Sequence, residues 1–90
     1  NDFEMITGPC AIKIWAYFDI PKSKSKKFKE AALASKERPT KKPDADNIVK
    51  AILDALNGLM YKDDSCIVEL HCIKYYSDLP RVEVYVNDFA

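Results

Sequence analysis

Apolar and polar side chains alternate from Ala11 to Phe18, a pattern that predicts a β-strand. One face of this strand carries four apolar side chains, and the other carries Lys13, Trp15 and Tyr17. Aromatic rings therefore partly cover the second face as well. Pro21 ends the pattern.

Two later segments have the spacing of amphipathic helices. The first is expected to begin after an N-cap at Ser23 or Ser25 and to run to about Ser35, with lysines on its exposed side. The second, Asp46 to Asn57, carries two adjoining rows of apolar side chains at helical spacing. Gly58 follows it, where a left-handed C-terminal residue is common. Each helix therefore offers one apolar stripe to a core.

Two strands are expected after the second helix, from about Cys66 to Tyr76 and from Val82 to Val86. The short turn Asp78-Leu79-Pro80 between them favours an antiparallel hairpin. The order β-α-α-β-β then predicts an α/β (α+β two-layer) fold, in which two helices pack on one face of a small mixed β-sheet. A single domain is expected over residues 1–90.

Several properties of the chain limit the class of protein. No apolar run approaches the roughly 20 residues that cross a bilayer, so no membrane association is expected. Cys10, Cys66 and Cys72 lack C-x-x-C spacing, which argues against a disulfide framework or a zinc site. Reduced thiols indicate a cytoplasmic location. The chain begins at Asn1 rather than Met, which is compatible with a piece of a longer protein.

The formal net charge of +0 hides a strong polarity along the chain. Residues 22–42 hold nine basic and two acidic side chains, and the rest of the chain holds five basic and twelve acidic ones. A basic segment beside an acidic one suits a protein that holds a phosphodiester backbone with cations and a metal ion with carboxylates. The alternative is a lysine-rich, solvated helix and loop.

The acidic residues gather around the second helix. Asp44 and Asp46 stand at its start, Lys50 one turn inside it, and the pair Asp63-Asp64 follows it. Two carboxylates about 4 Å apart repel by roughly 4 kcal/mol at an effective dielectric near 20, and a divalent cation removes this cost. Few protein ligands, all oxygen, suit Mg²⁺ or Mn²⁺. One aspartate of the 63–64 pair completes such a site if the strand after the helix lies alongside the residues that enter it.

A bound cation would activate a water and neutralise charge on a phosphate, with Lys50 assisting. The alternative for Asp44 and Asp46 is ordinary helix capping and surface charge, and for Lys50 an i,i+4 ion pair of about 0.3–0.5 kcal/mol. His71 has no partner histidine or serine motif and is expected to be structural. Strand aromatics such as Trp15 are expected to pack rather than to stack on bases.

The chain resembles the RusA family of Holliday junction resolvases, metal-dependent endonucleases found in prophages and related phages. Its similarity extends from Gly8-Pro9 to the closing Arg81-Val82-Glu83-Val84. Three segments are the most specific part of this resemblance, namely Lys42-Pro43-Asp44-Ala45-Asp46-Asn47 with Lys50, Asp54-Ala55-Leu56-Asn57-Gly58, and Tyr61-Lys62-Asp63-Asp64.

The resemblance implies that Asp44, Asp46 and Asp64 are the essential metal-binding carboxylates and that Lys50 is the catalytic lysine. It also implies a homodimer that makes paired, symmetric nicks in four-way DNA junctions during recombination and repair. Candidate phosphate contacts are Lys22, Lys24, Lys26, Lys27, Lys41, Lys42 and Lys62. The residues alone leave Asp63 and Asp64 open as the third ligand, whereas the family favours Asp64.

Family members usually begin with a further N-terminal strand, which this chain is expected to lack. An edge beside the 11–18 strand would then be exposed for pairing with another chain. Two other functions stay open: a non-catalytic module that binds structured DNA, and a nuclease for flaps or other branched DNA.

Overall fold

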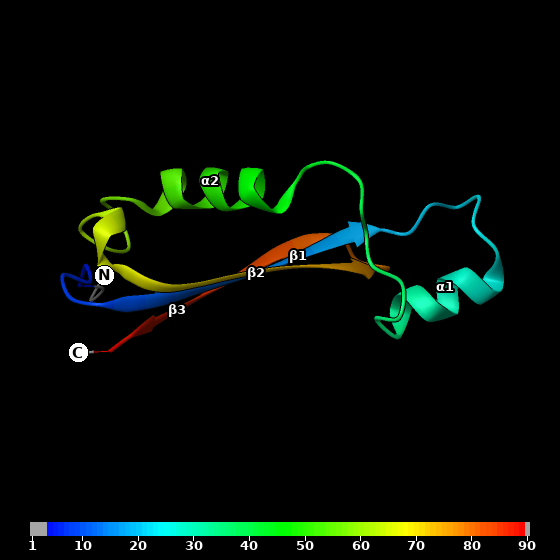
Figure 1. Cartoon of the computed structure of the whole chain (residues 1–90), viewed down its shortest axis with the longest axis horizontal. Helices are drawn as coiled ribbons and strands as arrows, with labels where there is room; N and C mark the ends of the chain where they lie inside the picture. Colours follow the sequence, from blue (N-terminus) through cyan, green and yellow to red (C-terminus); the bar gives the residue numbers. More distant parts are fainter. Residues whose placement is uncertain (1–3, 90) are drawn as a thin grey trace.

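The computed structural model describes residues 4–89 and confirms a small mixed sheet with two helices. Its elements are β1 (Cys10–Asp19), α1 (Lys26–Leu33), α2 (Ala45–Leu56), the 3₁₀ turn η1 (Asp64–Cys66), β2 (Ile67–Ser77) and β3 (Arg81–Asp88). Figure 1 shows α2 along one face of the sheet and α1 near the end of the sheet that lies opposite the two chain termini. Neither helix of the described range is long and apolar enough to span a bilayer.

The strand order is β2-β1-β3, with β1 parallel to β2 and antiparallel to β3. The expected hairpin between the last two strands is therefore wrong. Because β1 separates β2 from β3, the turn at residues 78–80 must cross two strand spacings, or roughly 10 Å. Three connecting residues can cover that distance in an extended chain, so the short turn did not require the two strands to pair.

β1 occupies the centre of the sheet, and the face that it turns to α2 is largely buried. Ile12 and Ile14 have no exposed surface, and on the other face the Trp15 ring lies 4.9 Å from the Tyr85 ring, centroid to centroid. The exposed edge expected beside β1 is also wrong, since both of its edges carry partners. The free edges of the sheet belong to β2 and β3 instead.

The core lies between β1 and α2. Ile48 is the buried residue of α2 and joins Ile12, Ile14 and Tyr61 in one apolar cluster. The helix extends from the 44–46 end back over the sheet toward η1 (Figure 1), so that β1, α2 and the parallel strand β2 form a β-α-β crossover. This crossover determines where the acidic residues lie.

α1 begins as expected after Ser25, whose hydroxyl accepts a hydrogen bond from the Phe28 amide (3.1 Å). It is shorter than predicted, because it ends at Leu33 and Ser35 adopts a positive φ of 62°. The rings of Phe28 and of Tyr76 on β2 pack edge to face, 5.8 Å between centroids. α2 covers one face of the sheet, and α1 packs against one end of β2.

Candidate metal and nucleic-acid site

The entrance of α2, defined as residues 42–50, carries two exposed carboxylates. Asp44 is the N-cap residue, and Asp46 lies in the first turn. Asp44 makes no side-chain capping bond. Between residues 4 and 89, neither carboxylate accepts a hydrogen bond, whereas a pure capping role would require one. Both are therefore available to a ligand, at the end of the helix where the dipole favours negative charge.

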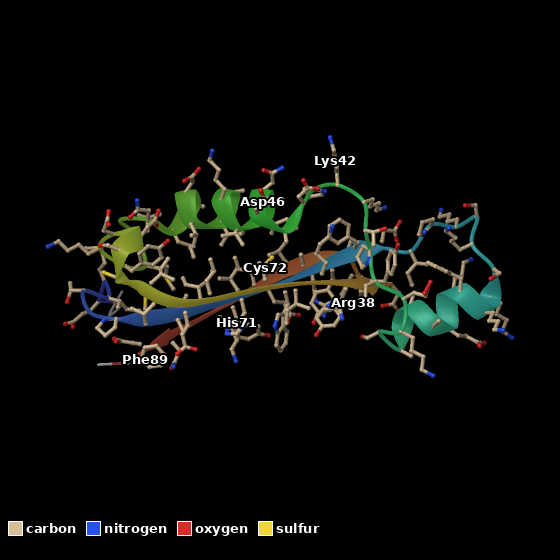
Figure 2. The ribbon with its side chains drawn as sticks, in the orientation of Figure 1. Arg38, Lys42, Asp46, His71, Cys72 and Phe89 are labelled. Carbon is tan, nitrogen blue, oxygen red and sulfur yellow. The ribbon has the colours of Figure 1, made fainter. Side chains whose placement is uncertain are left out.

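Lys50 lies one turn after Asp46 on the same side of α2, and its side chain is exposed. Its spacing from Asp46 would allow an i,i+4 ion pair, but the described part of the chain has no ion pair between them. Its ammonium is thus not neutralised by Asp46 in this structure. Figure 2 shows Asp46 and Lys42 projecting to the same side of the molecule, away from the sheet.

The segment that leads into α2 is anchored to the sheet. The Lys74 ammonium on β2 donates a hydrogen bond to the carbonyl of Lys41 (2.7 Å), and the Arg38 guanidinium donates one to the carbonyl of Lys74 (2.5 Å). Pro39 is buried, and the Lys42–Pro43 peptide bond is cis. The two hydrogen bonds hold the chain against β2 just before it reaches Asp44.

The exit of α2, defined as residues 57–66, holds the other two acids in different roles. The Asp63 carboxylate accepts a hydrogen bond from the Ser65 amide (3.0 Å) and caps η1. Hydrogen bonds from Ser65 lower the pKa of Asp63. Asp64 is the first residue of η1 and is exposed. Its Oδ1 accepts a hydrogen bond from the Tyr61 hydroxyl (2.9 Å).

The positions of the acids follow from the crossover. A 12-residue helix is about 18 Å long, so residues before α2 and residues after it lie at opposite ends of the sheet. The Tyr61 hydroxyl touches both Asp64 and the Leu53 carbonyl, and Leu53 lies about 10 Å along the helix from Asp46. Within residues 4–89, no group of three acidic, histidine or cysteine side chains is close enough to hold a metal ion. Asp44 and Asp46 share one end, and the structure does not bring Asp64 to them.

The basic candidates fall into three groups, all exposed. Lys22, Lys24, Lys26 and Lys27 lie in the loop before α1 and at its start, Lys41 and Lys42 precede α2, and Lys62 belongs to the exit. The first two groups both precede Asp44 along the chain. Lys24 also lies over the Phe28 ring, 4.9 Å from its centroid.

The face of the sheet opposite α2 is aromatic and carries His71. The Tyr17 and Tyr75 rings stack at 5.5 Å, and the guanidinium of Arg81 lies 3.9 Å from the Tyr17 centroid. Figure 2 shows His71 on the side of the sheet away from Asp46. His71 is exposed, and its expected structural role stays a prediction.

Sequence reasoning missed Tyr61 as a member of the site. The side chain has no exposed surface. Its burial, and to a lesser extent its hydrogen bond to Asp64, raises the pKa of Tyr61. The sequence did contain a hint of this role. Tyr61 stands two positions before the Asp63-Asp64 pair, close enough for its hydroxyl to reach a carboxylate.

Together these features define a small α+β fold. Two carboxylates at its α2 N-terminus have no hydrogen-bond partner among residues 4–89, and two lysine-rich segments precede them in the sequence. The model of the RusA endodeoxyribonuclease family matches residues 2–87. The chain therefore belongs to the RusA family.

One curated relative is "Uncharacterized protein YqaN" of Bacillus subtilis (strain 168), 51% identical over 88 residues. The match covers 96% of this chain and 62% of YqaN. The chain thus spans less than two thirds of the length of that relative. No solved structure matches the chain.

Proposed function

We propose that this protein is a metal-dependent endodeoxyribonuclease that resolves four-way DNA junctions by paired, symmetric nicks in recombination and repair. The observation that carries the proposal is the entrance of α2. There, Asp44 and Asp46 are exposed, without hydrogen-bond partners in the described chain, and are followed by Lys50 in a chain of the RusA family.

The donor set at the entrance fits a magnesium-type ion. Mg²⁺ binds through one or two carboxylates and keeps several waters that substrate phosphates can replace, and the Asp44–Asp46 pair supplies that number of ligands. A bound Mg²⁺ or Mn²⁺ would supply an activated water and neutralise charge on the reacting phosphate. Asp44 and Asp46 would hold the cation, and Lys50 would offer its ammonium to the phosphate oxygens.

We assign Asp64 as a third carboxylate of the catalytic set, in preference to Asp63, whose oxygens cap η1. Because Asp64 lies at the exit, it does not join Asp44 and Asp46 within one chain. We propose that two copies form a homodimer in which the exit of one chain adjoins the entrance of the other. Two-fold symmetry then makes two equal sites, as paired nicks require.

The lysines before α1 and before α2, together with Lys62, would contact DNA phosphates. Such contacts give affinity that depends little on sequence and falls steeply with salt. A DNA substrate and the free thiols of Cys10, Cys66 and Cys72 favour the cytoplasm as the location.

The decisive experiment incubates the protein with an end-labelled four-way junction and with a matched linear duplex, each in Mg²⁺ or in EDTA. Wild-type protein should place paired nicks in the junction only, and only with Mg²⁺. Asp46→Asn should bind the junction without cutting it, and Asp78→Asn, which removes an equal charge from the turn after β2, should cut normally. Cleavage by Asp46→Asn at the wild-type rate would refute the proposed site.

The dimer arrangement has its own test in mixed variants. Asp46→Asn and Asp64→Asn should each be inactive alone. If each site combines two chains, a mixed dimer retains one intact site and nicks one strand of the junction. If all carboxylates of a site come from one chain, the mixed dimer has no intact site, and mixing restores nothing.

A non-catalytic DNA-binding module is the second candidate, because Asp64 does not join Asp44 and Asp46 in the described chain. Junction binding without cleavage in either Mg²⁺ or Mn²⁺ would support this function. A small panel that includes flaps and splayed duplexes would separate a junction resolvase from a nuclease for other branched DNA.

A further inference from the structure

The ring of Tyr61 is fixed in place by packing and by its backbone. It is the largest fully buried side chain of the described residues and belongs to the core cluster under α2. The Tyr61 carbonyl accepts a hydrogen bond from the Gly58 amide (2.9 Å). On either side of it, Met60 and Lys62 pair with the backbone of Ile6 (3.0 and 2.8 Å). The position of the hydroxyl is therefore determined by the fold.

This hydroxyl has one proton and two acceptors within reach. The Asp64 Oδ1 is at 2.9 Å, and the Leu53 carbonyl is at 3.3 Å. The shorter contact goes to the charged acceptor, as expected for a charge-assisted hydrogen bond. Tyr61 thus connects the last turns of α2 to the first residue of η1.

We propose that Tyr61 is a positioning residue, whose hydroxyl fixes the orientation of the Asp64 carboxylate so that its second oxygen faces outward to a ligand. The catalytic part of this inference rests on the proposed function, in which Asp64 belongs to the catalytic set. The structural part, the fixed orientation of Asp64, does not.

A bond that served folding alone would not need Asp64. A buried phenol hydroxyl requires one acceptor, and the Leu53 carbonyl is close enough to provide it. Asp64, by contrast, is exposed, and its carboxylate accepts no other hydrogen bond within residues 4–89. Without Tyr61, the side chain of Asp64 would sample several staggered rotamers. Removing an outer partner of a metal-ligating group typically costs roughly 10–100-fold in metal affinity or activity.

Tyr61→Phe keeps the ring in the core and removes only the hydroxyl. Tyr85→Phe is a matched control, since the Tyr85 hydroxyl also donates to a carboxylate, Glu83 (2.7 Å), but on β3. The first measurement is the χ1 rotamer distribution of Asp64 from NMR coupling constants, which needs neither metal nor DNA. The second is the Mg²⁺ concentration that gives half-maximal junction cleavage, measured beside Asp64→Asn.

We expect a single Asp64 rotamer in the wild type and in Tyr85→Phe, and averaged rotamers in Tyr61→Phe. The Mg²⁺ requirement or the cleavage rate of Tyr61→Phe should worsen by roughly 10–100-fold, with Tyr85→Phe unchanged. Averaged rotamers in the wild type, or one rotamer in Tyr61→Phe, would overturn the inference. If Tyr61→Phe does not fold, averaged rotamers in the wild type would still overturn the inference, and a single rotamer there that becomes averaged in Tyr61→Leu would support it.

The two proposals fail in different ways. Averaged rotamers in Tyr61→Phe with unchanged metal dependence would support the orienting bond, refute its catalytic consequence and leave the nuclease. If Asp64→Asn cleaves like the wild type, or if the wild type does not cleave at all, the catalytic role of Asp64 is wrong. The coupling constants still decide whether Tyr61 orients the carboxylate.

Discussion

The two ends of α2 hold their carboxylates in opposite ways. At the entrance, Asp44 and Asp46 are exposed and have no hydrogen-bond partner in the described chain. At the exit, Asp63 caps η1 and Asp64 is bonded to a buried tyrosine. Carboxylates without a hydrogen-bond partner at a helix N-terminus are available to a cation. A carboxylate that accepts a hydrogen bond from the protein is restricted in its orientation. This difference is the basis of our proposal that the entrance binds the cation and that the exit contributes one oriented carboxylate.

Asp46→Asn should produce the largest effect, because it removes one of two free carboxylates at the entrance. Junction cleavage in Mg²⁺ should fall to the level seen in EDTA, and junction binding should be equal or tighter, since a negative charge next to DNA is lost. Gel shift and cleavage assays at equal protein concentration measure the two properties. Parallel loss of binding and cleavage in a folded variant would contradict a metal-binding role.

Ile48→Ala should come next, because Ile48 is the buried residue that holds the entrance end of α2 to the core. Replacing a buried isoleucine by alanine typically costs about 2–5 kcal/mol of unfolding free energy. Urea unfolding should show this loss, and the exposed Ala51→Ser of the same helix is the control. A change below about 0.5 kcal/mol would mean that α2 is held mainly from the exit.

Lys41→Ala combined with Lys42→Ala should weaken DNA binding at the entrance. If each lysine neutralises one phosphate, the slope of log affinity against log salt should become shallower by about 1.8. Lys13→Ala, on the opposite face of the sheet, should leave the slope unchanged. Binding isotherms between low and physiological salt measure it, and equal slopes for all three proteins would place the DNA elsewhere.

The smallest effect concerns pH at the exit. Because the pKa of Asp63 is lowered from its ordinary value of 3.8 by hydrogen bonds from Ser65, the folded chain takes up this proton at a lower pH than the unfolded chain. The stabilisation is complete above the unfolded pKa and is lost as the pH falls below about 4. Asp63→Asn keeps a capping side chain but does not titrate, so its unfolding free energy should decline less between pH 5 and pH 3. A decline equal to that of the wild type would show that the cap is not formed.

Much of the local structure could be predicted from the sequence. Periodicity located both helices and all three strands, the N-cap at Ser25 was among the predicted ones, and Gly58 adopts the expected positive φ of 77°. These features depend on residues within a few positions of one another, which is why a pattern in the chain reveals them. The family followed in the same way from the motif around Asp44, Asp46 and Lys50.

Strand pairing and the assembly of the site depended on contacts between distant residues. A short turn suggested a hairpin, but β1 pairs with both β2 and β3 and lies between them. The resulting β-α-β crossover put Asp64 about a helix length from Asp44, although both stand in one motif of the sequence. The sequence therefore located α2 and the carboxylates that we propose to carry the chemistry. Only the tertiary structure decided which carboxylates are free, which is held by Tyr61 and which share an end, because these depend on the path of the chain through space.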